Sequence, residues 1–191
     1  MNDILHFWFG DPPYTQQTYA ERRKLWFGKN PEVDCQIRDR FLETYHQASS
    51  GVLKDWRDSP HGCLALILVL DQFPRNMFRD QPQAFATDHQ ARTIAETAIA
   101  QGFDQELAPV ERVFLYLPLE HSENLAHQNQ CVALMQTLSE ANPELQDVFD
   151  YALRHRAVIE RFGRFPHRNR ILGRENTIEE TEFLQQPGSS F

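Results

Sequence analysis

The sequence has few of the features that mark cross-linked or membrane-spanning proteins. Its three cysteines, Cys35, Cys63 and Cys131, are widely spaced and form no C-x-x-C pair. We therefore expect neither a disulfide framework nor a cysteine zinc site. The longest apolar run, 63–70, is far shorter than the ~20 residues that cross a bilayer. Residues 1–9 show no secretory signal, so a cytoplasmic location without a membrane contact is expected.

Motifs that bind nucleotides or supply a nucleophile are also missing. The chain contains no G-x-x-x-x-G-K-[ST], G-x-G-x-x-G or G-x-S-x-G pattern. The formal net charge of −8 opposes a whole-protein electrostatic grip on nucleic acid or on an anionic membrane. We therefore expect no nucleic-acid partner. The length of 191 residues fits one domain.

Helix start and stop signals recur along the chain, whereas hairpin turn signals are missing. Asn30 and Ser59 each stand before a proline, which is typical of a helix start. Glycine follows an aromatic helix end at positions 10 and 28. Helical signals mark the segments 31–49, 60–73, 87–102, 109–116, 122–138, 142–163 and 177–187. We predict a single all-α domain over 1–191, with about seven or eight helices and a frayed tail at 187–191.

Prolines and cap residues set the expected boundaries of these helices. The buried central helix 60–73 should stop before Pro74, and helix 109–116 should close before Pro118. Side-chain caps are expected at Asn30 and Ser59 and also at Thr87, Ser122 and Thr177.

Positive charge is concentrated in one segment. Residues 154–174 carry +6, which leaves −14 for the remainder. Its seven arginines are Arg154, Arg156, Arg161, Arg164, Arg168, Arg170 and Arg174. They can pair with the protein's own carboxylates, such as Asp71, Glu120 and Glu123, or they can form a pocket for a phosphate or carboxylate group. Nucleic acid is the least favoured of the three interpretations.

Within this segment, Gly163 should end a helix and Pro166 should force a turn. A compact bend would let several donors fan out together, or its phenylalanines would fill the core while the arginines face water. Asp71 and Arg75 follow the apolar run, where they either pair across a turn or form the floor of a pocket. The residues expected to bind a ligand are Asp71, Arg75, Arg161, Arg164, His167, Arg168 and Asn169.

Two histidines lie beside carboxylates or on a buried face. His121 lies between Glu120 and Glu123, and His155 falls near the buried face of its helix. A histidine with a carboxylate can exchange protons, although a satisfied core histidine is the alternative for His155. These four are the candidate catalytic residues. His121, Glu123, His155 and His167 offer metal-ligand types, but no spacing such as H-E-x-x-H supports a metal site.

Several stretches of the chain resemble the bacterial family known as domain of unknown function 924. The resemblance implies an all-helical domain of the tetratricopeptide-like class, with helices stacked as antiparallel pairs. No cofactor or catalytic residue can be carried over from it, so the cofactor is unknown. The matching stretches are 7–10 (FWFG), 64–78 (LALILVLDQFPRNMF), 84–88 (AFATD), 116–123 (YLPLEHSE), 155–174 (HRAVIERFGRFPHRNRILGR) and 177–180 (TIEE).

Two functions remain open at this point. In the first, the chain binds a small anion or acts as an enzyme, with arginines holding the anion and His121 or His155 exchanging a proton. In the second, it is a helical scaffold that binds a peptide or protein in a groove. The scaffold predicts partly exposed tryptophans among Trp8, Trp26 and Trp56.

Overall fold

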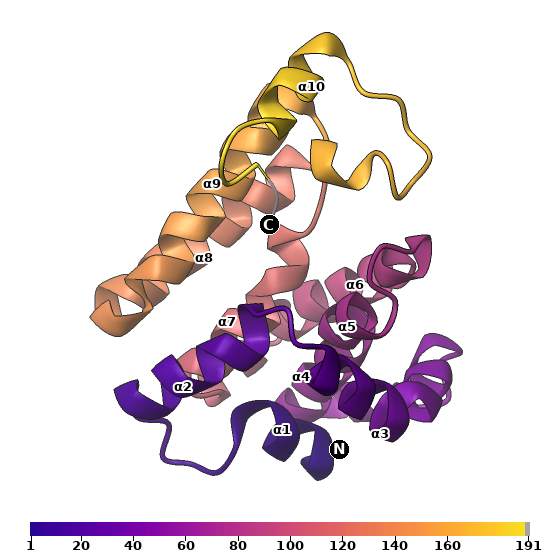
Figure 1. The fold of residues 1–191 in the computed structure, drawn as a ribbon. Coiled ribbons are helices and arrows are strands. Elements are labelled where there is room, and N and C mark those ends of the chain that lie inside the picture. The colour runs from indigo at the N-terminus through magenta and orange to yellow at the C-terminus, as the bar shows by residue number, and fades with distance from the viewer. Residues whose placement is uncertain (190–191) are drawn as a thin grey trace.

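The computed structural model describes residues 1–189, which form helices and connecting turns without a strand (Figure 1). The α-helices are α1 (Asn2–Phe9), α2 (Gln16–Phe27), α3 (Pro31–Ser49), α4 (Pro60–Ile67), α5 (Phe73–Met77), α6 (Asp88–Ala100), α7 (Pro109–Glu120), α8 (Leu125–Ala141), α9 (Gln146–Phe162) and α10 (Ile178–Leu184). Shorter helical segments are η1 (Lys54–Asp58), η2 (Leu68–Gln72), η3 (Pro82–Phe85), η4 (Phe103–Glu106), η5 (Pro143–Leu145) and η6 (Pro166–Arg168). The all-α prediction is confirmed, and its number of helices is close.

The core is built around α4 and α7, which are apolar on most sides. All residues from Gly62 to Leu70 are buried, as expected of a central helix. The rings of Trp8, Phe73 and Phe114 are fully buried. The ring centroid of Trp8 lies 5.6 Å from that of each phenylalanine. Trp26 is also buried and Trp56 is half-buried. The scaffold hypothesis predicted partly exposed tryptophans. That prediction is wrong for Trp8 and Trp26, whereas Trp56 is partly exposed.

The central helix does not stop before Pro74, as the sequence had predicted. It widens into a π-helical turn, η2, in which the Phe73 amide donates to the carbonyl of Leu68, and it continues as α5. Pro74 has no N–H for the carbonyl of Leu70, so that carbonyl needs another donor. The hydroxyl of Thr87 supplies it at 2.6 Å. Thr87 consequently forms no side-chain cap on α6, and its predicted capping box is wrong.

Two further predicted boundaries are corrected near the end of α7. The helix continues through Pro118 to Glu120, because its residues from Val113 onward are buried and their packing outweighs one lost hydrogen bond. Asn124 caps α8, with its side chain accepting from the amide of Ala126 at 2.8 Å. The hydroxyl of Ser122 instead bonds the His127 ring at 2.8 Å. The predicted side-chain caps at Asn30, Ser59 and Thr177 are confirmed.

Helices α8 and α9 form a long hairpin, and the chain then folds back as α10 (Figure 1). Gly163 ends α9 in the left-handed conformation, at φ 68°, as predicted. A small apolar cluster joins α9 to the returning chain through Val158, Ile159, Phe165 and neighbouring rings. We call residues 163–189 the C-terminal arm. The tetratricopeptide-like stacking implied by the resemblance stays a prediction.

Of the predicted tail, the described part ends at Ser189, whose hydroxyl donates to the carbonyl of Leu184 at 3.1 Å. Residues 190 and 191 lie outside the described residues. Among residues 1–189, no helix has both the length and the apolar character needed to cross a membrane.

Candidate functional site

Charged side chains from separate parts of the chain meet at one place, which we call the central cluster. It consists of Asp71, Arg75, Asp88, His121 and Arg168. Nδ1 of His121 lies 2.8 Å from Oδ1 of Asp71, and Nη1 of Arg75 lies 3.3 Å from the same oxygen. Arg75 also donates twice to Asp88, at 3.0 and 3.1 Å. Arg168 donates to the backbone carbonyl of His121 at 3.1 Å.

The local structure explains how these residues come together. The π-helical turn η2 places Asp71 inside the protein, where none of its side chain is exposed. The amide of Gln72 donates to the second carboxylate oxygen of Asp71 at 2.5 Å. His121 is the residue that directly follows α7, and Arg168 ends η6. The central cluster thus joins the π-helical turn η2, the end of α7 and the short helix η6.

The ionisation states follow from burial and from the neighbouring charges. Although burial opposes it, Arg75 and His121 hold the pKa of Asp71 below its ordinary value. Burial, assisted by Arg75, lowers the pKa of His121. His121 is therefore neutral at pH 7 beside an ionised carboxylate. Such an imidazole keeps its proton on Nδ1 and presents Nε2 as a base.

Arg168 has an unusual environment for a guanidinium. It lies between the rings of Phe85 and Phe165, at 4.8 and 4.5 Å from their centroids, with 8% of its side chain exposed. Burial and the charge of Arg75 lower the pKa of Arg168 to about 10, so it remains charged at pH 7. Its Nε has no hydrogen-bond partner within the described chain. The rings of Phe85 and Phe165 thus hold the Arg168 guanidinium in place, and its Nε remains available as a hydrogen-bond donor.

His155 and Glu120 form a second histidine–carboxylate pair near the central cluster, and both side chains are buried. Nδ1 of His155 lies 3.3 Å from Glu120 and 2.9 Å from the carbonyl of Tyr151. Burial and the nearby charge of Asp71 raise the pKa of Glu120 to about 8. Burial lowers the pKa of His155 to about 3. Both groups are therefore neutral at pH 7.

The remaining predicted residues form a separate set of contacts on the C-terminal arm. Arg164 donates to both oxygens of Glu180 at 2.6 and 2.7 Å, and Asn169 reaches the same carboxylate at 3.3 Å. Glu123 accepts two hydrogen bonds from Arg174, at 2.7 and 2.9 Å, and one from the Phe165 amide. These contacts connect parts of the C-terminal arm with one another and with the turn between α7 and α8.

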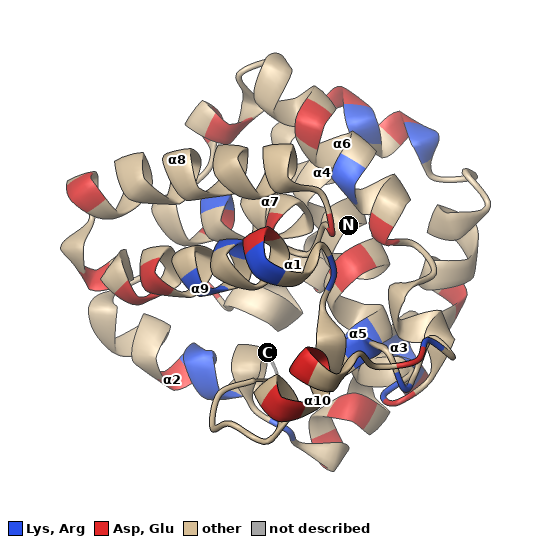
Figure 2. Ribbon diagram, turned by 90° about the horizontal axis from the view of Figure 1, so that it is seen from above, with Lys and Arg blue, Asp and Glu red and all other residues tan. Residues whose placement is uncertain are grey.

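Two more members of the predicted set lie at the edges of this region. Arg161 pairs with Glu179 at 2.7 Å, and both side chains are about half exposed to solvent. His167 lies beside the ring of Phe165, and burial and the charge of Arg168 lower its pKa to about 4. Acidic and basic segments are interspersed over the helices, as Figure 2 shows. The structure thus brings Asp71, Arg75, His121 and Arg168 together and leaves Arg161 and Arg164 outside that group.

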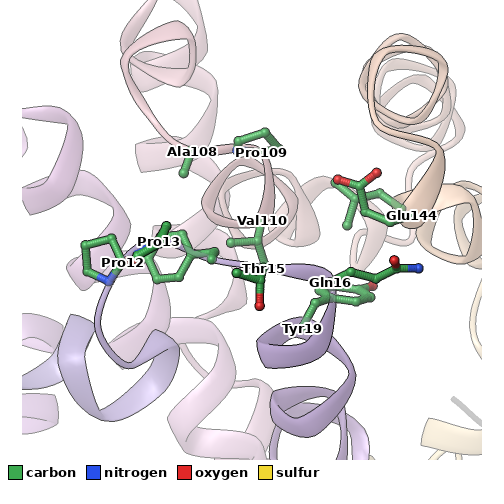
Figure 3. A pocket seen from close by; sticks show the side chains of 11 residues that line it. Pro12, Pro13, Thr15, Gln16, Tyr19, Ala108, Pro109, Val110 and Glu144 are labelled. Atoms are coloured by element: carbon green, nitrogen blue, oxygen red, sulfur yellow. The ribbon is translucent and has the colours of Figure 1, made fainter.

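Sequence reasoning missed Asp88 and Phe85, which complete the environment of Arg168. Both belong to the stretch 84–88 that supports the family resemblance, which was the available signal. No group of three metal-ligating side chains suited to a metal occurs in the described chain. A cavity of about 260 Å³ lies away from the central cluster, between the segment Pro12–Tyr19, the start of α7 and η5 (Figure 3).

The fold and this site define an all-helical protein with a buried carboxylate–histidine–arginine centre. The chain belongs to the family described as bacterial protein of unknown function (DUF924), whose model matches residues 4–188. The family resemblance seen in the sequence is thereby confirmed. The chain is similar to the solved structure of a protein of unknown function from Agrobacterium tumefaciens. That protein is 39% identical, with 96% of each chain covered and a TM-score of 0.84. No curated protein matches the chain.

Proposed function

We propose that this protein is an enzyme that moves a proton on a small substrate bearing a phosphate or carboxylate group, at the central cluster. His121 is the base, Asp71 orients it, and Arg168 binds the anionic group. One observation carries the proposal: the Asp71–His121 pair lies beside a fixed arginine that retains donor capacity. Because the three cysteines are free thiols, we place this activity in the reducing cytoplasm.

The assignment of His121 depends on its two ring nitrogens. Nδ1 bonds the buried Asp71 carboxylate, which fixes the ring and its tautomer. Nε2 makes no hydrogen bond within residues 1–189, and 14% of the side chain is exposed. A lowered pKa keeps Nε2 unprotonated at pH 7. A base of this kind accepts a proton from a substrate and is stabilised as imidazolium by Asp71.

The assignment of Arg168 depends on a donor that its carboxylate neighbours leave free, because its Nε has no hydrogen-bond partner within the described chain. Asp88 is its nearest carboxylate, at 3.5 Å, and that carboxylate already receives two shorter hydrogen bonds from Arg75. Glu120, which lies one residue before His121, is neutral at pH 7 and adds no charge. A phosphate or carboxylate is the group whose geometry suits an arginine fork. Such a group would accept a hydrogen bond from the free Nε of Arg168.

Ligand-induced stabilisation tests the proposal directly. We expect inorganic phosphate or a small carboxylate, screened as millimolar mixtures, to raise the melting temperature of the protein. The variant Arg168→Gln should lose that response. The matched control is Arg170→Gln, which removes the same charge from the same segment at a side chain that is 83% exposed. Absence of stabilisation by every anion, or equal loss in both variants, would overturn the proposal.

A proton-transfer role has its own readout. The His121 imidazole should titrate below its ordinary pKa in nitrogen-15 NMR, and its pKa should rise when an anion binds at Arg168. His121→Gln should keep anion binding and abolish turnover once a substrate is found among the stabilising compounds. An unchanged His121 titration in the presence of a stabilising anion would place that anion elsewhere.

A further inference from the structure

The cavity between the N-terminal segment and α7 has walls of two kinds. Pro12, Pro13, Val110 and Leu145 supply apolar surface, while Tyr14 and Tyr19 supply aromatic rings. Figure 3 shows Pro12 and Pro13 at one end, Val110 in the middle, and Tyr19 with Glu144 at the other end. None of the central-cluster residues lines this cavity. It is therefore a separate candidate site.

Buried or half-buried carboxylates hold both tyrosines in place. The hydroxyl of Tyr14 donates to Glu111 at 3.1 Å, and that of Tyr19 donates to Asp147 at 3.1 Å. Burial and the adjacent carboxylate raise the pKa of each tyrosine, that of Tyr14 to about 12, so both hydroxyls stay protonated donors. A phenol that donates to a carboxylate has a more electron-rich ring. Such rings attract cations to their faces.

The charge around the cavity is negative. Asp147 is compensated by Arg23, at 2.7 Å, whereas Glu111 lies behind Tyr14 without an arginine or lysine partner in the described chain. The His61 ring lies 3.8 Å from Glu111. Glu144 lines the cavity, is exposed and forms no ion pair within residues 1–189. The cavity thus has one unpaired carboxylate, Glu144, on its wall beside aromatic and apolar surfaces.

We propose that this cavity binds a small organic cation, a quaternary or protonated amine carried on a compact apolar body. The prolines, Val110 and Leu145 contact the body, and the ammonium group lies at the end formed by Tyr19 and Glu144. An aromatic site with an unpaired carboxylate on its wall recognises such a cation by charge and by the ring faces together. The proposal is independent of the chemistry at the central cluster.

The test compares choline with 3,3-dimethyl-1-butanol, a neutral probe of the same shape in which carbon replaces the nitrogen. Binding to the full chain is followed by saturation-transfer NMR and by the fluorescence of Trp26, whose ring lies 5.7 Å from that of Tyr19. We expect choline to bind at least 10-fold more tightly than the alcohol. Equal affinities would show a merely apolar cavity, and no binding of either probe would overturn the proposal outright.

Two variants locate the binding. Glu144→Gln should weaken choline binding several-fold and leave the alcohol unchanged, because it removes charge without changing shape. Glu182→Gln is the matched control, since Glu182 is also exposed and unpaired in the described chain but lies on α10. Tyr19→Phe keeps the ring, removes its anchor to Asp147 and should weaken choline binding as well. If Glu182→Gln weakened binding as much as Glu144→Gln, the attraction would belong to net charge and not to the cavity.

Discussion

Arg168 and Arg161 lie seven residues apart in the same basic segment, but their environments are opposite. Arg168 is stacked between two phenylalanine rings with 8% of its side chain exposed. Arg161 pairs with Glu179 at the surface, where 48% and 59% of the two side chains remain exposed. Arg170 is more exposed still, and Arg164 and Arg174 are intermediate. A run of like charge in a sequence therefore contains members with different physical roles.

The difference between Arg168 and Arg161 indicates which contacts contribute most to the free energy of unfolding. An exposed ion pair contributes little, because water screens it and two long side chains must be ordered. A buried charge is costly without partners, so it depends strongly on every contact it keeps. Most of the basic segment thus ties the C-terminal arm to nearby carboxylates. Only Arg168 combines burial, a lowered pKa and spare donors.

The largest expected effect comes from breaking the buried side of this comparison. Asp71→Ala would leave Arg75 and His121 without their shared carboxylate. We expect a loss of about 3–5 kcal/mol in the free energy of unfolding, measured by urea denaturation. Glu179→Ala serves as the exposed counterpart and should cost under about 1 kcal/mol. Equal costs for the two variants would show that burial does not set the energetic weight of these ion pairs.

An intermediate effect is expected at Glu180, which is buried although its partner Arg164 is partly exposed. Its carboxylate accepts from Arg164, from the amide of Thr177 and from Asn169. Glu180→Ala leaves these donors unsatisfied and should cost about 1–3 kcal/mol. Hydrogen exchange should show the loss concentrated in α10 and the preceding turn. Uniform faster exchange through α4 and α7 would mean that the arm is part of the central core.

The pH dependence of stability tests the neutral pair of His155 and Glu120. The folded protein keeps the Glu120 proton up to a pKa of about 8, whereas the unfolded chain releases it near the ordinary glutamate value. The folded state therefore binds more protons, and stability falls as pH rises towards 8. The lowered pKa values of His121, His155 and His167 act in the opposite direction, and their contribution fades about one pH unit above the ordinary histidine pKa of about 6.5.

The histidine contributions are common to the wild type and Glu120→Gln, so the difference between their two profiles isolates Glu120. The stability of the wild type relative to Glu120→Gln should fall by about 1–2 kcal/mol between pH 6.5 and 8, since one pKa unit corresponds to about 1.4 kcal/mol. Urea denaturation at half-unit steps of pH makes the measurement. A variant with the same slope as the wild type would show that Glu120 ionises normally in the folded protein.

The sequence was informative wherever one local interaction decides the structure. The caps at Asn30, Ser59 and Thr177 and the glycine end of α9 follow from single side chains and neighbouring amides. The boundaries at Pro74 and Pro118 were mispredicted because packing overrides a proline inside a buried helix. The π-helical turn also requires the distant hydroxyl of Thr87, which no local pattern contains.

The sequence allowed most residues of the central cluster to be predicted, but not how their side chains are arranged in space. Motifs containing Asp71, His121 and Arg168 were identified as chemically unusual, and the fold brings these three side chains together. Which arginine turns inward depends on Phe85 and Asp88, which lie far away in the sequence. Sequence spacing therefore could not separate Arg168 from Arg161 and Arg164.

The smallest expected effect lies at the exposed end of the comparison, and it is the most sensitive check on it. Arg161→Gln removes an ion pair in which both side chains are about half exposed. Its cost should be under about 1 kcal/mol and should disappear in 0.5–1 M salt (roughly the range in which surface charges are screened). Arg161 also lies 4.7 Å from the ring of Phe162, so Arg161→Lys separates the loss of charge from the loss of stacking. A salt-independent cost in Arg161→Gln that Arg161→Lys reproduces would assign the contribution to stacking, and one above about 2 kcal/mol would place Arg161 with the buried group.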